Sequence, residues 1–113
     1  MHMSEVMLIE KFISASIPSH SEHRWEIRRP PTAVLGVLVT FSLSTDGANA
    51  TFLIRSAWDD AKVQPFGQKT SWPDTSFVSG ALNLHGDGPW ILAVQNRMNH
   101  SVSVQGKISV GAL

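Results

Sequence analysis

The stretch VLVTFSLSTDGANATFLI, residues 37–54, decides the fold of this chain. Its first half alternates apolar and polar residues, the period of a β-strand with one buried face. The residues on the apolar face are Val37, Val39, Phe41 and Leu43. Asp46 then favours an Asx turn and Gly47 supplies positive φ, as hairpin turns require. We therefore predict a central strand over residues 32–44 that folds back as a hairpin into a strand over 50–57.

Period-two patterns continue on both sides of this stretch, and turn residues close each segment about every ten residues. Further strands are predicted over residues 6–17, 22–28, 76–84, 90–96 and 101–110. Their expected core residues are Val6, Leu8, Phe12, Trp25, Ile27, Trp90, Val102, Val104, Ile108 and Val110. Gly106 lies within the last alternation and suggests a β-bulge. The fold class is all-β, a single-domain antiparallel β-sandwich or jelly roll of about seven to eight strands spanning residues 1–113.

Composition narrows the function classes. The chain has 113 residues, nine basic and nine acidic side chains and a formal net charge of zero. It therefore lacks the positive field that nucleic-acid binding requires, while the absence of self-repulsion is compatible with a homo-oligomer. Because there are no cysteines, disulfides and thiolate sites are excluded. The start of the sequence shows no signal peptide, so we expect a cytoplasmic or non-classically exported protein, and no apolar run is long enough to span a bilayer.

Two segments resemble the corresponding parts of GOLD domains, the β-sandwich interaction modules of Golgi trafficking and lipid-transfer proteins. They are residues 37–54 and the closing pair GPWILAVQNRMNHSVSVQGKISV, residues 88–110. Val39-Thr40-Phe41 stands at the W-x-F strand of that family, Ala50-Thr51-Phe52 at its D-I-x-F strand, and Gln95-Asn96 at its late D-N-S-type turn. The resemblance covers about half of the chain. It implies a β-sandwich that binds other proteins.

The connection WDDAKVQPFGQKTSWPD, residues 58–74, is the predicted binding loop. Tryptophan faces can stack on the C–H face of a sugar while carboxylates accept hydrogen bonds from its hydroxyls. The candidate ligand-binding residues are Trp58, Asp59, Asp60, Trp72 and Asp74, joined by His85 and Asp87 from the following turn. The alternative is that a tryptophan covers one end of the core and the aspartates make Asx turns.

The spacing of the polar residues indicates neither a metal site nor a catalytic site. His20 and His23 lie three apart in a loop or strand, where their side chains would diverge. His85 and Asp87 could hold calcium only with carboxylates from the binding loop, and no calcium-loop pattern is present. Adjacent Asp59 and Asp60 do not form a glycosidase pair, and no nucleophile elbow or phosphate loop occurs. We predict no cofactor, no metal and no enzymatic activity.

Two functions therefore compete. The first is a small lectin-like β-sandwich that binds a glycan through the loop of residues 58–74. The second is a GOLD-like protein-interaction or assembly module without a small ligand, in which Trp58 and Phe66 contact the partner protein.

Overall fold

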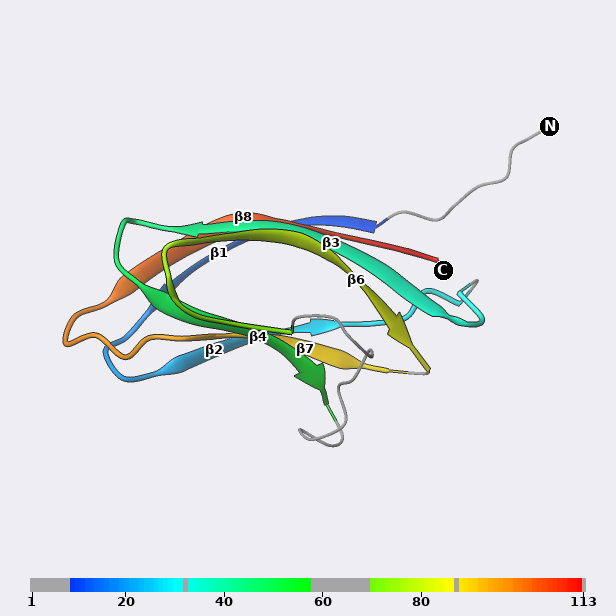
Figure 1. Ribbon diagram of the computed structural model, residues 1–113, viewed down its shortest axis with the longest axis horizontal. Helices are drawn as coiled ribbons and strands as arrows, with labels where there is room; N and C mark the ends of the chain where they lie inside the picture. The colour runs from blue at the N-terminus through cyan, green and yellow to red at the C-terminus, as the bar shows by residue number, and fades with distance from the viewer. Residues whose placement is uncertain (1–8, 32, 58–69, 87, 113) are drawn as a thin grey trace.

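The chain folds into two antiparallel sheets packed face to face, and the computed structural model describes residues 9–31, 33–57, 70–86 and 88–112 (Figure 1). Within these residues the strands are β1 (Ile9–Ile17), β2 (Glu22–Ile27), β3 (Gly36–Thr45), β4 (Ala50–Ser56), β5 (Ser71–Thr75), β6 (Phe77–His85), β7 (Trp90–Gln95) and β8 (Val102–Ala112). Sheet A has the order β1-β8-β3-β6, and sheet B the order β2-β7-β4-β5. The described residues form no helix, and hence no helix that is long and apolar enough to span a membrane. The predicted all-β sandwich is confirmed.

The apolar alternation correctly predicts the core face of most strands. Val37, Val39, Phe41 and Leu43 are buried between the sheets, and β3 is an interior strand, as predicted. The predicted alternation of the last strand is also buried, and its members are Val102, Val104, Ile108 and Val110. Trp90 belongs to the core, and Trp25 packs against it while remaining half-buried.

The predicted hairpin between β3 and β4 is wrong. The chain reverses at Asp46-Gly47, but β4 joins the opposite sheet, because β8 and β6 already occupy both edges of β3. Backbone hydrogen bonds hold the turn to sheet A as the chain leaves it: Thr45 N donates to Ser76 O at 2.9 Å and Asp46 N to Ser103 O at 3.1 Å. A turn signal specifies a reversal and leaves open which strand receives the returning chain.

Three further expectations need correction. Phe12 is 80% exposed, since Ile13 and Ile17 carry the buried face of β1, whereas Val6 and Leu8 lie outside the described residues. The register of β8 with β1 and β3 continues unbroken through Gly106, so no bulge occurs there. Residues 71–74, placed in the binding loop by the sequence, belong to strand β5 (Ser71–Thr75), which pairs with β4.

A buried asparagine joins the two loops at one end of the sandwich. Asn96 is 1% exposed, and the two N–H groups of its side-chain amide Nδ2 are shared among three backbone oxygens, those of Ile17 at 2.9 Å, Pro18 at 3.0 Å and His100 at 2.8 Å. Its Oδ1 accepts from the Met98 amide at 2.8 Å. The side chain thus connects the end of β1 to the loop between β7 and β8, satisfying backbone groups away from water.

Candidate functional site

The structure describes three of the seven residues that were expected to form one binding site. Trp58, Asp59, Asp60 and Asp87 lie outside the described residues. The other candidates are Trp72 and Asp74 on β5 and His85 at the end of β6.

Trp72 points toward the interior. Its ring meets that of Phe41 edge-on, with centroids 5.1 Å apart and planes inclined by 65°, and it is half-buried against the core. Phe41 in turn covers Gly80 on the neighbouring strand, since a Cβ there would lie 3.2 Å from the Phe41 ring. The two aromatic rings close the β5–β6 side of the sandwich where Gly80 contributes no side chain. Trp72 therefore matches the alternative in which a tryptophan covers the core.

Asp74 and His85 lie at opposite ends of the side of the sandwich that β5 and β6 form. Asp74 is exposed near the corner between β5 and β6, with φ of 48°, and its amide donates to Thr51 Oγ1 at 3.4 Å. His85 is the last residue of the nine-residue strand β6, whose first and last Cα atoms are separated by eight steps of about 3.3 Å, or about 26 Å along the strand. Asp74 and His85 therefore lie far apart.

A different surface, the outer face of sheet A, gathers polar side chains from all four strands. The register aligns them in rows across β1, β8, β3 and β6. One row is Phe12, Lys107, Ser42 and Ser79, and the next is Ser14, Gln105, Ser44 and Phe77. Ser16, Ser103, Thr40 and Asn83 extend the same exposed face. Sheet A thus presents hydroxyl and amide groups, which both donate and accept hydrogen bonds, across its outer face.

Two adjoining depressions lie along this face. The larger, of about 570 Å³, is open and is lined by Phe12, Ile13, Ser14, Ser42, Ser44, Gln105, Gly106 and Lys107. The smaller, of about 160 Å³, is lined by Ser14, Thr45, Asp46, Ser103, Val104 and Gln105. Ser14 and Gln105 line both depressions, so the two form one continuous surface, which we call the sheet A track.

The sheet A track has one aromatic end and one acidic end. At the aromatic end the Lys107 ammonium lies 5.9 Å from the centre of the Phe12 ring and 3.5 Å from a Glu10 carboxylate oxygen, so its charge is partly balanced. At the other end Asp46 Oδ2 accepts from the Ser103 amide at 3.3 Å. Hydroxyls and one amide fill the space between. This set offers an apolar ring, neutral donors and acceptors, and a carboxylate to a ligand rich in hydroxyls.

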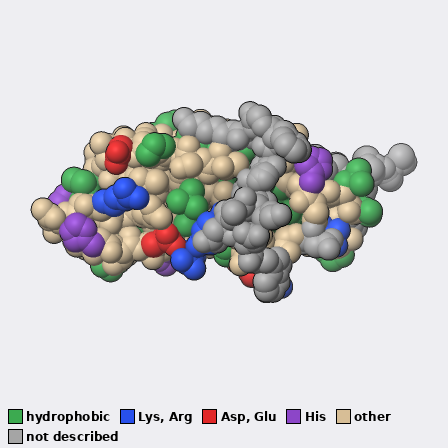
Figure 2. Space-filling view, turned by 60° about the horizontal axis from the view of Figure 1, so that its bottom comes forward, with side chains coloured by type: hydrophobic (Ala, Val, Ile, Leu, Met, Phe, Trp, Pro, Cys, Tyr) green, Lys and Arg blue, Asp and Glu red, His purple; other side chains and the backbone are tan. Residues whose placement is uncertain are grey.

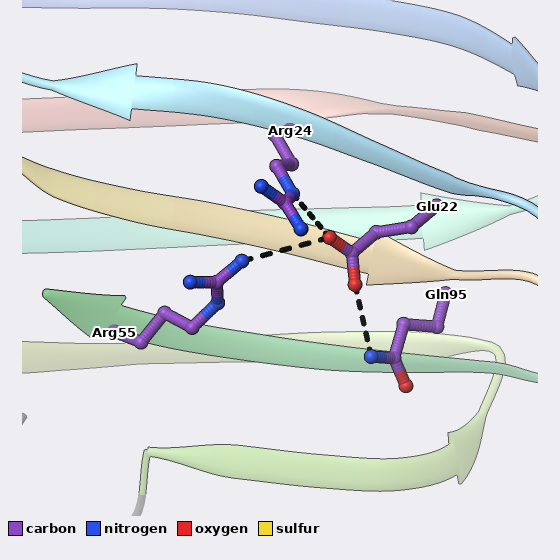
Figure 3. Close-up of polar contacts among 4 residues, drawn as sticks. All are labelled: Glu22, Arg24, Arg55 and Gln95. Carbon is purple, nitrogen blue, oxygen red and sulfur yellow. Dashed lines mark hydrogen bonds and ion pairs between the residues drawn. The ribbon is translucent and has the colours of Figure 1, made fainter. Parts of the chain in front are cut away.

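The outer face of sheet B carries a charged cluster, and Figure 2 shows basic and acidic side chains next to one another. There Glu22 accepts hydrogen bonds from Arg24 and, at 2.9 Å, from the Gln95 amide, and Arg55 lies 3.7 Å away (Figure 3). Burial alone would raise the pKa of Glu22, but these hydrogen bonds and the two arginine charges outweigh it and lower the pKa below its ordinary value of 4.5. Glu22 thus remains ionised in the fold.

We expect the Glu22 cluster to stabilise the fold in a pH-dependent way. Because the pKa is depressed on folding, the contribution is present above pH 4.5 and is lost as the pH falls through the folded-state value. Glu22→Gln should therefore lower the free energy of unfolding by about 1 kcal/mol at neutral pH and by less in acid. Urea unfolding at both pH values measures this, with the more exposed Glu26→Gln as the control. An equal effect of Glu22→Gln at both pH values would contradict the expectation.

The described residues contain no cluster of three or more acidic or histidine side chains suited to a metal ion. His20 faces Asn99 at 3.2 Å, whereas the His23 ring lies 4.4 Å from that of Trp25 between centroids, so the two histidines do not converge. The sheet A track carries a signal that the sequence interpretation missed. Serine recurs at every second position in Ser14-Ala15-Ser16 and Ser42-Leu43-Ser44, on the face opposite the apolar one.

Comparison with protein-family models and with curated protein sequences finds no match. Among solved structures, the chain is similar to the pre-peptidase C-terminal domain of a collagenase from Bacillus anthracis. That match has a TM-score of 0.62 and 14% identity, covering 88% of this chain and 89% of that one. It is also similar to the Yersinia pseudotuberculosis-derived mitogen, with a TM-score of 0.51 and 12% identity over 95% of this chain and 88% of the other. These similarities support the β-sandwich fold.

Proposed function

We propose that the chain is a non-catalytic, lectin-like module that binds a neutral glycan along the sheet A track. The observation that carries the proposal is the continuity of the two depressions through Ser14 and Gln105, between the exposed ring of Phe12 and the carboxylate of Asp46. Sugar rings present an apolar C–H face and a rim of hydroxyls, and the track offers a partner to each. The β-sandwich fold is compatible with this role without specifying it.

An open track of this kind suits an extended chain of sugars better than a single residue. Its depressions are shallow and lie side by side across the strands, so neighbouring sugars could each contact a few hydroxyls. Each contact would contribute little because water competes for the same groups. We therefore expect weak binding of short oligosaccharides and stronger binding of polymers, whose repeated units engage several sites.

Two variants of one exposed residue test the proposal. Phe12→Ala removes the stacking ring and should weaken polysaccharide binding by about tenfold, whereas Phe12→Trp should retain it. Because Phe12 is 80% exposed, neither change should disturb the core. Affinity electrophoresis through gels containing neutral polysaccharides measures the effect. Equal mobility of the wild type and Phe12→Ala in a gel that retards both would contradict the assignment to the track.

The loop of residues 58–74 stays a competing location for the same activity. If Trp58→Ala abolishes glycan retention and Phe12→Ala does not, the site belongs to the loop with Trp58, Asp59 and Asp60. Trp72→Ala is a less direct probe, since loss of its contact with Phe41 should lower stability before it affects binding. Thermal unfolding of each variant separates these two effects.

The second candidate is a GOLD-like protein-interaction module, and one feature favours it. Val34 and Leu35 are 77% and 69% exposed, next to one another between β2 and β3. Arg29 holds this segment by donating to the backbone oxygens of Ala33 at 3.0 Å and Val34 at 3.2 Å. Two adjacent apolar side chains on a segment held in this way are suited to burial in a partner protein. A wild-type chain retarded by no polysaccharide in the gel experiment would favour this function.

A further inference from the structure

The open edge of β2 is a surface that the glycan proposal does not use. Within the described part of the chain, β2 is the first strand of sheet B and pairs only with β7, and it lies beside β1, the edge strand of sheet A (Figure 1). An edge strand exposes backbone N–H and C=O groups that can pair with another strand. The side chains along this edge determine which strand fits.

The hydrogen-bond pattern of β2 identifies the residues that face the open edge. Asn96 N donates to Ser21 O at 2.8 Å, and this pair continues the register in which Glu22 opposes Gln95. Bonded and non-bonded pairs alternate in an antiparallel ladder, so the odd-numbered residues bond to β7. The even-numbered residues direct their backbone groups outward at the edge. They are Glu22, Arg24, Glu26 and, directly after the strand, Arg28.

These four residues alternate in charge along one face of the strand. The side chains of Arg24, Glu26 and Arg28 are 60%, 41% and 79% exposed, and that of Glu22 is 23% exposed. If a second β2 pairs antiparallel with Trp25 opposite Trp25, Glu22 lies opposite Arg28, and Arg24 lies opposite Glu26. Each of these pairs occurs twice by symmetry, and every pair joins opposite charges, which stabilises cross-strand neighbours.

We propose that a second copy of this chain binds at the β2 edge, forming a two-fold dimer in which the two sheets B continue into one another. The two-fold axis passes between the two Trp25 residues. In this register the outward-facing even-numbered residues form the bonded pairs, and the Trp25 pair is non-bonded. The backbone pattern is therefore compatible with the alignment that the charges favour.

Other registers fit less well. Shifting the axis to Arg24 places Arg24 opposite itself and Glu22 opposite Glu26, which brings like charges together. If the axis instead passes between the two Glu26 residues, Glu26 lies opposite Glu26 and Arg24 lies opposite Arg28, so like charges again come together. If the pairing shifts by one residue, each residue whose backbone N–H and C=O groups face the open edge lies opposite a residue whose groups face β7. The two strands then cannot form the hydrogen bonds of an antiparallel ladder. The alternating charges thus specify a partner, whereas a row of like charges would repel one.

An apolar groove beside the edge provides further contact area. It has a volume of about 300 Å³ and is lined by Ile9, Lys11, Trp25, Glu26, Ile27, Arg28, Ile108 and Val110. The half-buried ring of Trp25 forms part of its wall. In the dimer the second copy's Trp25 lies across the axis from this ring, so aromatic surface that is now solvated becomes buried.

The symmetry also orients the two glycan-binding surfaces. A two-fold axis that relates antiparallel strands of one sheet is perpendicular to that sheet. The outer faces of the two sheets B therefore lie on the same side of the continuous sheet. The outer faces of both sheets A consequently point in one direction. Where the glycan proposal holds, a dimer would present two parallel tracks to a polysaccharide and gain avidity. The dimer itself does not depend on that function.

A charge exchange between two variants tests the interface. Arg24→Glu places a second carboxylate opposite Glu26 at both symmetric pairs, and Glu26→Arg places a second guanidinium opposite Arg24. Each variant alone should therefore have a dimer dissociation constant raised about tenfold. An equimolar mixture restores opposite charges at both pairs and should form the heterodimer with wild-type affinity. Sedimentation equilibrium from micromolar to millimolar concentration measures all three samples. Lys107→Glu, the same type of change on sheet A, is the control and should dimerise as the wild type does.

The outcomes are distinct. A wild type that stays monomeric throughout this range, or variants that dimerise as the wild type does, would overturn the proposal. Variants that are weakened but do not associate on mixing would overturn the register. Both substitutions lie at exposed positions, and circular dichroism of each variant verifies the fold. Polysaccharide binding that fails in a chain that dimerises would overturn the glycan proposal and leave the dimer intact.

Cross-linking tests the position of the axis directly. Since the chain has no cysteine, Trp25→Cys creates one thiol for each copy. Opposed residues of a non-bonded pair have Cα atoms about 4.5 Å apart, which suits a disulfide. His23→Cys is the matched control, because the axis places its symmetry mate about 13 Å away along the strand. We expect rapid oxidation to a covalent dimer for Trp25→Cys alone, and equal rates for both variants would contradict the register.

Discussion

Asn96→Asp is expected to lower the free energy of unfolding by about 3–5 kcal/mol, a large part of the stability of a domain of this size. The substitution keeps the shape of the side chain and removes its amide donors. The backbone oxygens of Ile17, Pro18 and His100 would then face a carboxylate instead of an N–H group. Each oxygen loses its amide partner, and the new charge, on a side chain that is 1% exposed, is buried among acceptors.

The same loop supplies the control for this prediction. Asn99 is exposed and faces the His20 ring at 3.2 Å, so Asn99→Asp makes the identical chemical change on the surface. Its effect should stay within about 0.5 kcal/mol. Denaturant unfolding of both variants measures the difference. If Asn96→Asp unfolds at the same midpoint as Asn99→Asp, the side chain of Asn96 does not hold the two loops together.

Local patterns predicted the strands well because each pattern needs only neighbouring residues. The alternation of Val37, Val39 and Phe41 is a property of the segment itself, and the sandwich buries that face. The pairing partner of a strand depends on the rest of the chain. Asp46-Gly47 reverses the chain as expected, but β8, which follows more than fifty residues later, takes the edge of β3 that a hairpin would have used.

The candidate site was harder to predict for the same reason. Trp72 has the aromatic ring of a sugar platform, yet it packs against the Phe41 ring, which covers Gly80 where that residue has no side chain. Conversely, Ser14, Ser42 and Gln105 are ordinary polar residues when taken one at a time. They become a surface only when the register brings three strands together. Alternating serine on the outer face is a signal that can be found in a sequence, but it does not reveal which strands lie side by side.

Gly106→Ala is expected to destabilise the fold by about 2–4 kcal/mol, because β8 and β3 approach too closely there to admit a side chain. A Cβ at Gly106 would lie 2.1 Å from Ser42 O and 2.8 Å from Leu43 Cα, both backbone atoms. β8 cannot move aside, since it pairs with β1 on its other edge and its register continues through the same residue. Relief would require the two central strands of sheet A to separate, at the cost of neighbouring ladder hydrogen bonds.

Gly47→Ala is the control that distinguishes the steric effect at Gly106 from the general effect of replacing a glycine on the free energy of unfolding. Gly47 has φ of 112° but no atom of the described residues within 4 Å of a Cβ, so its substitution should cost about 1–2 kcal/mol through backbone strain alone. Urea unfolding of the two variants gives the comparison, and Gly106→Ala should be the less stable.

Because Gly106 also lines the sheet A track, separation of β8 from β3 would displace Ser42 and Gln105 relative to one another. Polysaccharide retention should therefore fall in Gly106→Ala and persist in Gly47→Ala, and equal stability of the two variants would contradict the steric argument.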